Sequence, residues 1–263
     1  MFTSPGAVAI NTPHITIYWY GIIMAAAFLI GQFFVVIFAK KEYKEENIFN
    51  TLTDIAFWAL LGGILGARLY YVLLSSSYYI KHPLEIIMLQ NGGLSIQGAL
   101  LGGIIAVLIY TKKTQTDFFK YADLYALGLP IAQAIGRWGN FFNSEAFGLP
   151  TSLPWGVFIP EALRPNAYNM YEFFHPTFLY ESLWNIFIFL ILFFVIKKHF
   201  FKNKGVVFFS YLILYSLGRI LIETIRVDSV LNILGIPVAV WACFITIIIS
   251  VVFLKKITKV KSL

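Results

Sequence analysis

Residues 17–39, IYWYGIIMAAAFLIGQFFVVIFA, contain no charged side chain. A bilayer core about 30 Å thick needs roughly 20 apolar residues per helical crossing, and in lipid each backbone N–H and C=O must be paired within the helix. This stretch therefore predicts a transmembrane helix. It is too long for the apolar core of a signal peptide and lacks a basic segment before it, so we expect it to remain as a membrane anchor.

Six further apolar runs have similar lengths. With the first, they lie at residues 17–39, 52–74, 93–111, 121–142, 176–196, 205–225 and 237–254. The chain is 59% apolar and only 13% charged, which is outside the range of water-soluble proteins. We predict an all-α integral membrane protein with about seven transmembrane helices in a single polytopic domain, residues 1–263. The polar stretch 143–175 predicts the main external loop, a small extracytoplasmic head.

The lysines predict how the chain is oriented. Apart from Lys81, they follow the first and last runs, or separate the third from the fourth and the fifth from the sixth. By the positive-inside rule this side is cytoplasmic, so the C-terminus is expected inside and the N-terminus outside. The net charge of +7 is explained by lysines that attract anionic lipid, which favours the lipid bilayer over nucleic acid as the partner. Asp54 and Asp123, near cytoplasmic helix starts, are expected to stabilise helix N-termini.

The arginines follow a different pattern, because they lie within the apolar runs or toward the outer side. They are Arg68, Arg137, Arg164, Arg219 and Arg226. An arginine near the centre of a membrane helix costs at least about 2.5 kcal/mol and persists where it faces a bundle interior or an anionic partner. A phosphate fits the planar guanidinium, whereas snorkelling or pairing with a carboxylate is the alternative for any single arginine. Together the five favour a phosphate site in the outer half.

Polar groups are most concentrated at residues 136–148, GRWGNFFNSEAFG, where an apolar helix is expected to end. Arg137 supplies a guanidinium fork, Asn140 and Asn143 supply amides, and Glu145 supplies a carboxylate. The glycines allow close approach of the backbone. Taken alone, the same residues are equally consistent with an amphipathic helix terminus that carries ordinary capping asparagines.

Residues 136–148 closely resemble the signature G-R-x-G-N-F-x-N-x-E-x-x-G of the prolipoprotein diacylglyceryl transferase family. Five more motifs resemble those of the family in the same order and cover nearly the whole chain. They are Tyr18-Trp19-Tyr20-Gly21, Gly66-Ala67-Arg68-Leu69, Asn91-Gly92-Gly93-Leu94-Ser95, His175-Pro176 with Leu179-Tyr180-Glu181, and Tyr215, Arg219, Glu223 and Arg226 at the spacing Y-x-x-x-R-x-x-x-E-x-x-R.

The resemblance implies transfer of the sn-1,2-diacylglyceryl group of phosphatidylglycerol to the lipobox cysteine of prolipoprotein signal peptides. The products are a thioether and glycerol phosphate, in the first step of lipoprotein maturation. The implied place is the bacterial cytoplasmic membrane, with the active site toward the outer leaflet. The nucleophile belongs to the substrate, so neither a metal nor another cofactor is expected.

The resemblance also implies the site residues. The phosphate gains negative charge as it leaves, so cations beside it stabilise the transition state. Arg137 and Arg219 are the candidates for this role, and Tyr20 and Glu145 are the other expected catalytic residues. On a helix, Arg219, Glu223 and Arg226 share one face. The expected substrate-binding residues are Asn140, Asn143, Gly148, Arg68, Glu223, Arg226, Gln97, His175 and Tyr180.

Position 97 departs from the family pattern. Many members carry a histidine there that is proposed to act in catalysis, whereas this chain has Gln97, which is no base near neutral pH. A cysteine thiol has a pKa of about 8.5 and needs either a base or an electropositive site. Either the arginines favour the thiolate, or Glu145, Tyr20 or His175 takes the proton. Weak activity or an altered substrate is a third explanation.

Other functions are compatible with a phosphate site in the outer half of the membrane. A non-catalytic phospholipid transporter or headgroup receptor would use the same arginines without breaking a bond. A phosphatidyltransferase or phospholipase usually needs a metal-binding aspartate cluster or a nucleophile with its base. We expect the transferase, because the asparagine-rich signature occurs together with the motifs around Tyr20 and Arg219.

Overall fold

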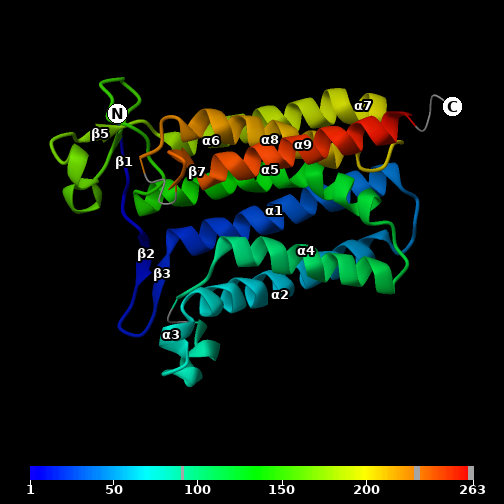
Figure 1. The fold of residues 1–263 in the computed structure, drawn as a ribbon. Helices are drawn as coiled ribbons and strands as arrows, with labels where there is room; N and C mark the ends of the chain where they lie inside the picture. The colour runs from blue at the N-terminus through cyan, green and yellow to red at the C-terminus, as the bar shows by residue number, and fades with distance from the viewer. Residues whose placement is uncertain (90–91, 228–231, 260–263) are drawn as a thin grey trace. The chain divides into compact units, whose positions relative to one another are not determined.

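The computed structural model describes residues 1–89, 92–227 and 232–259. Helices occupy every predicted apolar run, with ends shifted by a few residues (Figure 1). They are α1 (Trp19–Glu42), α2 (Ile48–Leu74), α4 (Ile96–Lys113), α5 (Phe118–Asn143), α6 (Thr177–Leu190), α8 (Val206–Glu223) and α9 (Val238–Lys259). A π-helical turn, Ile191–Ile196, continues α6 into α7 (Lys197–Phe200). The all-α integral membrane fold class is confirmed.

Helix α5 differs from the other long helices in composition. Within the described ranges, six helices are long and apolar enough to cross a membrane, and α5 is not among them. Its 26 residues would reach about 39 Å, so its length is sufficient. Its polar residues keep it below the required hydropathy. They are tolerated because neighbouring helices cover α5, along which only Leu129 and Trp138 are exposed. The seventh span therefore stays a prediction.

The chain divides into two compact units, residues 1–38 with 122–263, and residues 39–121. The first unit contains most of α1 and α5 together with α6, α8 and α9, whose helices lie side by side in Figure 1. The second unit contains α2 and α4. The single polytopic domain over residues 1–263 stays a prediction.

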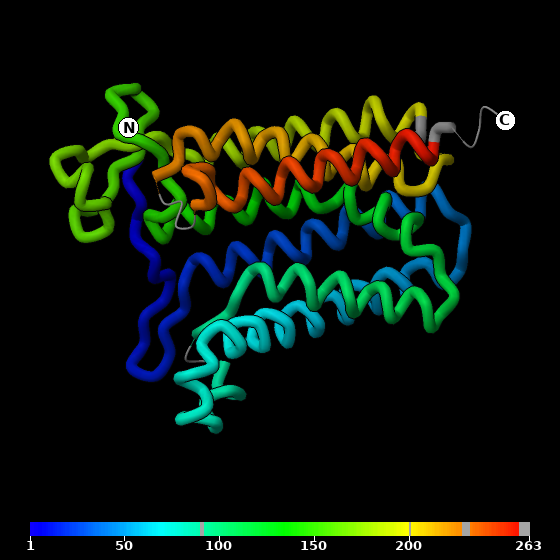
Figure 2. The backbone as a smooth tube through the Cα atoms, viewed as in Figure 1, coloured from blue at the N-terminus to red at the C-terminus, as the bar shows by residue number. Residues whose placement is uncertain are grey.

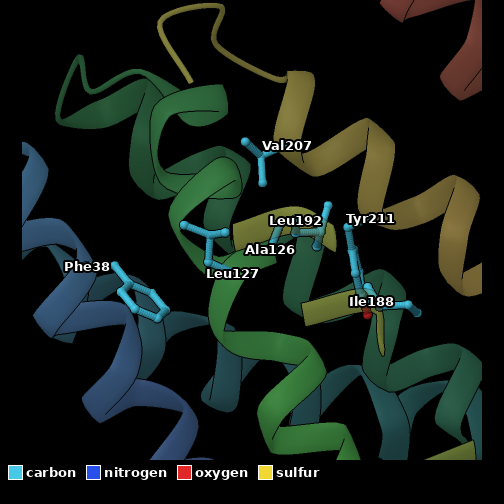
Figure 3. Close-up of a cluster of buried hydrophobic side chains, with 7 residues drawn as sticks. All are labelled: Phe38, Ala126, Leu127, Ile188, Leu192, Val207 and Tyr211. Carbon is cyan, nitrogen blue, oxygen red and sulfur yellow. The ribbon is translucent and has the colours of Figure 1, made fainter. Parts of the chain in front are cut away.

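The apolar core of the first unit joins four of its helices. Phe38 of α1, Leu127 of α5, Leu192 in the extension of α6, and Val207 and Tyr211 of α8 pack together, as Figure 3 shows. Leu127, Leu192 and Val207 have no exposed surface. Since Phe38 lies near the end of α1 and Val207 near the start of α8, this core lies at the end of the first unit where the lysines between α6 and α8 also lie.

Asp123 links two helices at that same end. Its Oδ2 accepts a hydrogen bond of 2.6 Å from the Gly205 N–H, and its Oδ1 accepts one of 2.8 Å from the Phe208 N–H. These N–H groups lie at the start of α8, so Asp123 caps a helix other than its own. Its expected role at a helix N-terminus is confirmed. Asp54 lies beyond the first turn of α2, where the helix dipole acts weakly, and its Oδ2 accepts a hydrogen bond of 2.9 Å from the Tyr110 hydroxyl, so the structure does not support the expected role for Asp54.

Replacing Asp123 by alanine is expected to destabilise the first unit by about 2–4 kcal/mol, because two N–H groups that it now satisfies lose their acceptor. The measurement is thermal unfolding of purified protein in detergent, where the melting temperature should fall by several degrees. Glu46→Gln, an exposed acid, is the control and should melt like the original chain. Equal melting temperatures for all three proteins would contradict a capping role.

In the second unit, α2 and α4 lie side by side and approach backbone to backbone (Figure 2). A Cβ atom on Gly66 would lie 2.4 Å from the Gly98 carbonyl oxygen, and one on Gly102 would lie 2.2 Å from the Gly62 carbonyl oxygen. The four-residue spacing of these glycines on each helix therefore serves close packing, as small residues do between membrane helices.

The predicted loop 143–175 is largely a small folded substructure of the first unit. Strand β4 (Val157–Phe158) pairs in parallel with β1 (Phe2–Thr3) and antiparallel with β5 (Phe173–Phe174). Phe147, Ile159 and Phe178 pack with β4 and β5 in a buried cluster. We call residues 144–176 the head segment. Figure 1 shows its strand β5 at one end of the first unit and the end of α9 at the other.

Short hairpins lead into two of the helices. Strands β2 (Val8–Asn11) and β3 (Thr16–Tyr18) pair antiparallel before α1. Strands β6 (Asn232–Ile233) and β7 (Ile236–Pro237) do so before α9.

The extracytoplasmic position of the head segment stays a prediction.

Candidate functional site

Three arginines meet around one buried glutamate. Glu181 of α6 is 4% exposed, and its Oε2 lies 2.5 Å from Nη2 of Arg137 on α5. Its Oε1 lies 3.0 Å from Nη1 of Arg226, which follows α8, and 3.8 Å from Nη1 of Arg219 on α8. The end of α5, the start of α6 and the end of α8 thus bring these side chains together beside the head segment.

Glu223 completes this group, which we call the arginine cluster. Its Oε2 lies 2.6 Å from Arg219 Nη2, one helical turn away. The prediction that Arg226 shares this helical face is wrong, because α8 ends at Glu223; Arg226 reaches the cluster from the turn after α8, through its pair with Glu181. Arg219 Nη1 is buried and has no hydrogen-bond acceptor within residues 1–89, 92–227 and 232–259. Its 3.8 Å distance to Glu181 is too long for a hydrogen bond. An incoming anionic oxygen would supply this acceptor.

The sequence of α6 explains why a charged residue points inward there. Its buried positions include Thr177, Glu181 and Asn185, which recur every four residues and lie on one face. Leu183 and Phe187 on another face are 56% and 47% exposed. A helix that presents apolar residues outward and polar residues to its neighbours suits a membrane bundle.

The end of the signature forms a second polar group. Glu145 Oε1 accepts hydrogen bonds from the Asn140 amide at 2.8 Å and from the Asn143 amide at 3.4 Å. Ser144 and Ala146, on either side of it, have φ of 52° and 54°, a left-handed conformation that costs energy for residues other than glycine. This turn presents an exposed carboxylate whose orientation is fixed by two amides.

The head segment connects directly to the arginine cluster through its backbone. The Gly148 N–H donates to the His175 carbonyl at 2.9 Å, and the Leu149 N–H donates to the Ile225 carbonyl at 2.8 Å. Gly148 consequently pairs with Arg226 in an antiparallel bridge. The head segment therefore fixes the backbone that carries Arg226.

His175 and Tyr180 form a third polar group. The Tyr180 hydroxyl lies 3.0 Å from His175 Nδ1 and accepts a hydrogen bond of 2.9 Å from Trp155 Nε1. The sequence did not indicate Trp155, because it lies away from the motif that contains His175 and Tyr180.

Two grooves adjoin these groups in the first unit. Tyr20, whose ring lies against Gly139, lines an open groove together with Asn143 and β3. A second groove, between α1, α5 and α6, is almost wholly apolar and is lined by Trp138 and Ser182 among others. These two residues directly follow Arg137 and Glu181 in the sequence, so the groove and the arginine cluster involve the same turns of α5 and α6.

Arg68 belongs to the second unit and is 6% exposed. Its guanidinium donates to five backbone carbonyls that follow α2, those of Glu85, Ile86, Met88, Gly92 and Gly93. Since an arginine has five N–H donors, this loop occupies all of them. The arrangement favours a structural role for Arg68, and its expected substrate binding stays a prediction.

Gln97 also belongs to the second unit, in the first turn of α4. Its Oε1 accepts a hydrogen bond of 2.6 Å from the hydroxyl of Ser95, which caps the helix. Its expected substrate binding stays a prediction.

Glu181 is the residue of the arginine cluster that was absent from the expected site residues. Glu181 ends the motif that begins at His175, and a carboxylate is one of the groups that pair with buried arginines, but the sequence does not show which arginines it meets.

Comparisons with known proteins show the family of this chain. Residues 7–255 match the family model described as prolipoprotein diacylglyceryl transferase. A phosphatidylglycerol--prolipoprotein diacylglyceryl transferase of Acaryochloris marina is 46% identical over 235 residues, which cover 88% of this chain and 83% of that protein. One from Thermotoga maritima is 45% identical over 216 residues, covering 81% and 72%. This chain therefore belongs to the prolipoprotein diacylglyceryl transferase family.

Proposed function

We propose that the chain transfers the sn-1,2-diacylglyceryl group of phosphatidylglycerol to the lipobox cysteine of prolipoprotein signal peptides. The cysteine sulfur forms a bond to the glyceryl carbon, and the bond from that carbon to the phosphate oxygen breaks. The electron pair leaves with glycerol phosphate, and the thiol proton passes to a base. The observation that carries the proposal is the convergence of Arg137, Arg219 and Arg226 on Glu181, with a buried N–H of Arg219 left for an oxygen ligand.

The charge change in this reaction suits the arginine cluster. A phosphodiester with one negative charge becomes a phosphomonoester that carries up to two, so the site must stabilise charge that appears as the bond breaks. Fixed guanidinium groups in a protein interior do this more strongly than water. The apolar groove beside Trp138 and Ser182 offers a surface for an acyl chain of the same lipid.

We further propose that the protein lies in the bacterial cytoplasmic membrane, with its N-terminus outside, its C-terminus inside and the arginine cluster toward the outer leaflet. The lysines support this orientation. In the first unit, Lys197 and Lys198 follow α6, and Lys255 and Lys256 lie near the end of α9. These ends lie away from the head segment (Figure 1).

The test is turnover by purified protein with phosphatidylglycerol and a lipobox peptide, followed by mass spectrometry. We expect the peptide to gain the mass of one diacylglyceryl group and the solution to gain an equal amount of glycerol phosphate. A peptide with alanine at the lipobox cysteine should gain nothing. Binding of the lipid without product would contradict the proposal and favour the phospholipid transporter or headgroup receptor.

Gly148→Ala is expected to lower turnover about 30-fold. A Cβ atom there would lie 2.9 Å from both the Ile225 carbonyl oxygen and the His175 Cβ, so the backbone that carries Arg226 must move. Gly156→Ala in the same head segment is the control, since its Cβ would come no closer than 3.2 Å to a neighbour. Equal turnover in the two variants would contradict a positioning effect of Gly148.

A further inference from the structure

Glu181 is the residue through which the arginine cluster is connected. It pairs with Arg137 through one carboxylate oxygen and with Arg226 through the other, and it lies within 4 Å of Arg219. These three arginines come from α5, α8 and the turn after α8, so no single helix holds them together. We infer that Glu181 is a positioning residue that holds the three guanidinium groups in one array. This inference rests on the proposed function.

The geometry excludes more direct roles for Glu181. Its side chain is 5% exposed and both oxygens contact guanidinium nitrogens, so neither oxygen is open to a substrate thiol. The negative charge of a phosphate would also be repelled by this carboxylate. Glu181 therefore acts on the reaction through the arginines.

Arg137 depends most on this carboxylate. Within the described part of the chain, Glu181 is the ion-pair partner of Arg137, whereas Arg219 also pairs with Glu223. Buried like charges repel one another with little screening. Without the Glu181 charge, the Arg137 guanidinium would move away from the other two, and the array would no longer match the geometry of the phosphate in the transition state.

Glu181→Gln should therefore have two separable effects. Loss of the shared anion displaces Arg137 and lowers kcat, because the transition state needs the arginines in place. The same change makes the cluster more positive by one charge, so the dianionic product, sn-glycerol 1-phosphate, should bind more tightly. A variant that only folds poorly would lose kcat in proportion to its folded fraction and would leave product affinity unchanged.

The experiment measures turnover and inhibition by sn-glycerol 1-phosphate for the original chain, Glu181→Gln, Glu181→Asp and the control Glu172→Gln, an exposed acid of the head segment. For Glu181→Gln we expect kcat to fall about 30-fold and the inhibition constant to fall about fivefold. Glu181→Asp keeps the charge but is shorter, so its inhibition constant should stay unchanged while kcat falls about fivefold. Glu172→Gln should match the original chain.

The outcomes separate two failures. If the original chain makes no thioether product, the proposed function fails. If it is active, an unchanged inhibition constant in Glu181→Gln overturns the inference, as does original turnover in either Glu181 variant. Should Glu181→Gln not fold, Glu181→Asp decides through its kcat: original turnover would overturn the inference, and the fivefold loss would support it.

Discussion

Arg137→Ala is expected to lower kcat/KM for diacylglyceryl transfer at least about 1,000-fold, while the protein still folds and inserts into the membrane. Removing one donor to a developing anion typically costs 100- to 1,000-fold, and Arg137 offers a planar fork. The variant also removes the Arg137 nitrogen that lies 2.5 Å from the Glu181 carboxylate, and this less neutralised carboxylate would repel the phosphate. The measurement is initial rate against phosphatidylglycerol concentration, normalised to folded protein.

Two further variants make this prediction specific. Arg137→Lys keeps the charge but replaces the fork by a single ammonium group, so we expect a loss of about 100-fold. Arg164→Ala is the matched control, because the Arg164 guanidinium donates to the backbone carbonyls of Ile159 and Asn169 within the head segment and, among the described residues, forms no ion pair with the cluster. Turnover by Arg137→Ala equal to that of Arg164→Ala would refute the phosphate role.

The sequence predicted the helices well because membrane helices obey a simple constraint. Each run of about 20 apolar residues has one stable backbone conformation in lipid, so α1 and α9 could be located from composition alone. Helix α5 shows where this reasoning stops. Its polar residues are tolerated because other helices cover them, and sequence periodicity does not show which helix lies in the middle of a bundle.

The head segment was predicted only as a polar loop. Strands β4 and β5 are two residues long each, and β1 pairs with β4 across more than 150 residues of sequence. A strand of two residues leaves no period-two pattern to detect. The buried cluster around Phe147 and Phe174 forms because the paired strands bring residues from distant parts of the segment together, and no local sequence pattern indicates it.

At the candidate site, the sequence motifs likewise indicated which residues take part but not which residues contact one another. The motifs indicated Arg137, Arg219, Glu223 and Arg226, and the structure brings them together. They did not indicate that Glu181 is the shared partner, because a carboxylate in a motif reads equally as a substrate ligand. Arg68 illustrates the converse, since its five donors go to carbonyls of a nearby loop.

Glu145→Gln is expected to lower kcat at least about 100-fold, because we propose Glu145 as the acceptor of the thiol proton. Its Oε1 accepts from Asn140 and Asn143, and its Oε2 has no hydrogen-bond partner within the described ranges. The amide variant keeps the size of the side chain and removes its ability to accept the proton. Turnover with the lipobox peptide is the measurement, and Glu161→Gln, an exposed acid in the head segment, is the control.

Gln97→His tests the same assignment from the other direction. If Glu145 takes the proton, a histidine at position 97 is redundant, so kcat should stay within about threefold of the original chain. In a Glu145→Gln background the histidine should then restore little activity, because a second base would have to lie within hydrogen-bond reach of the thiol. A tenfold gain from Gln97→His in either background would transfer the role of base to position 97, and Glu145 would keep only the orientation of Asn140 and Asn143.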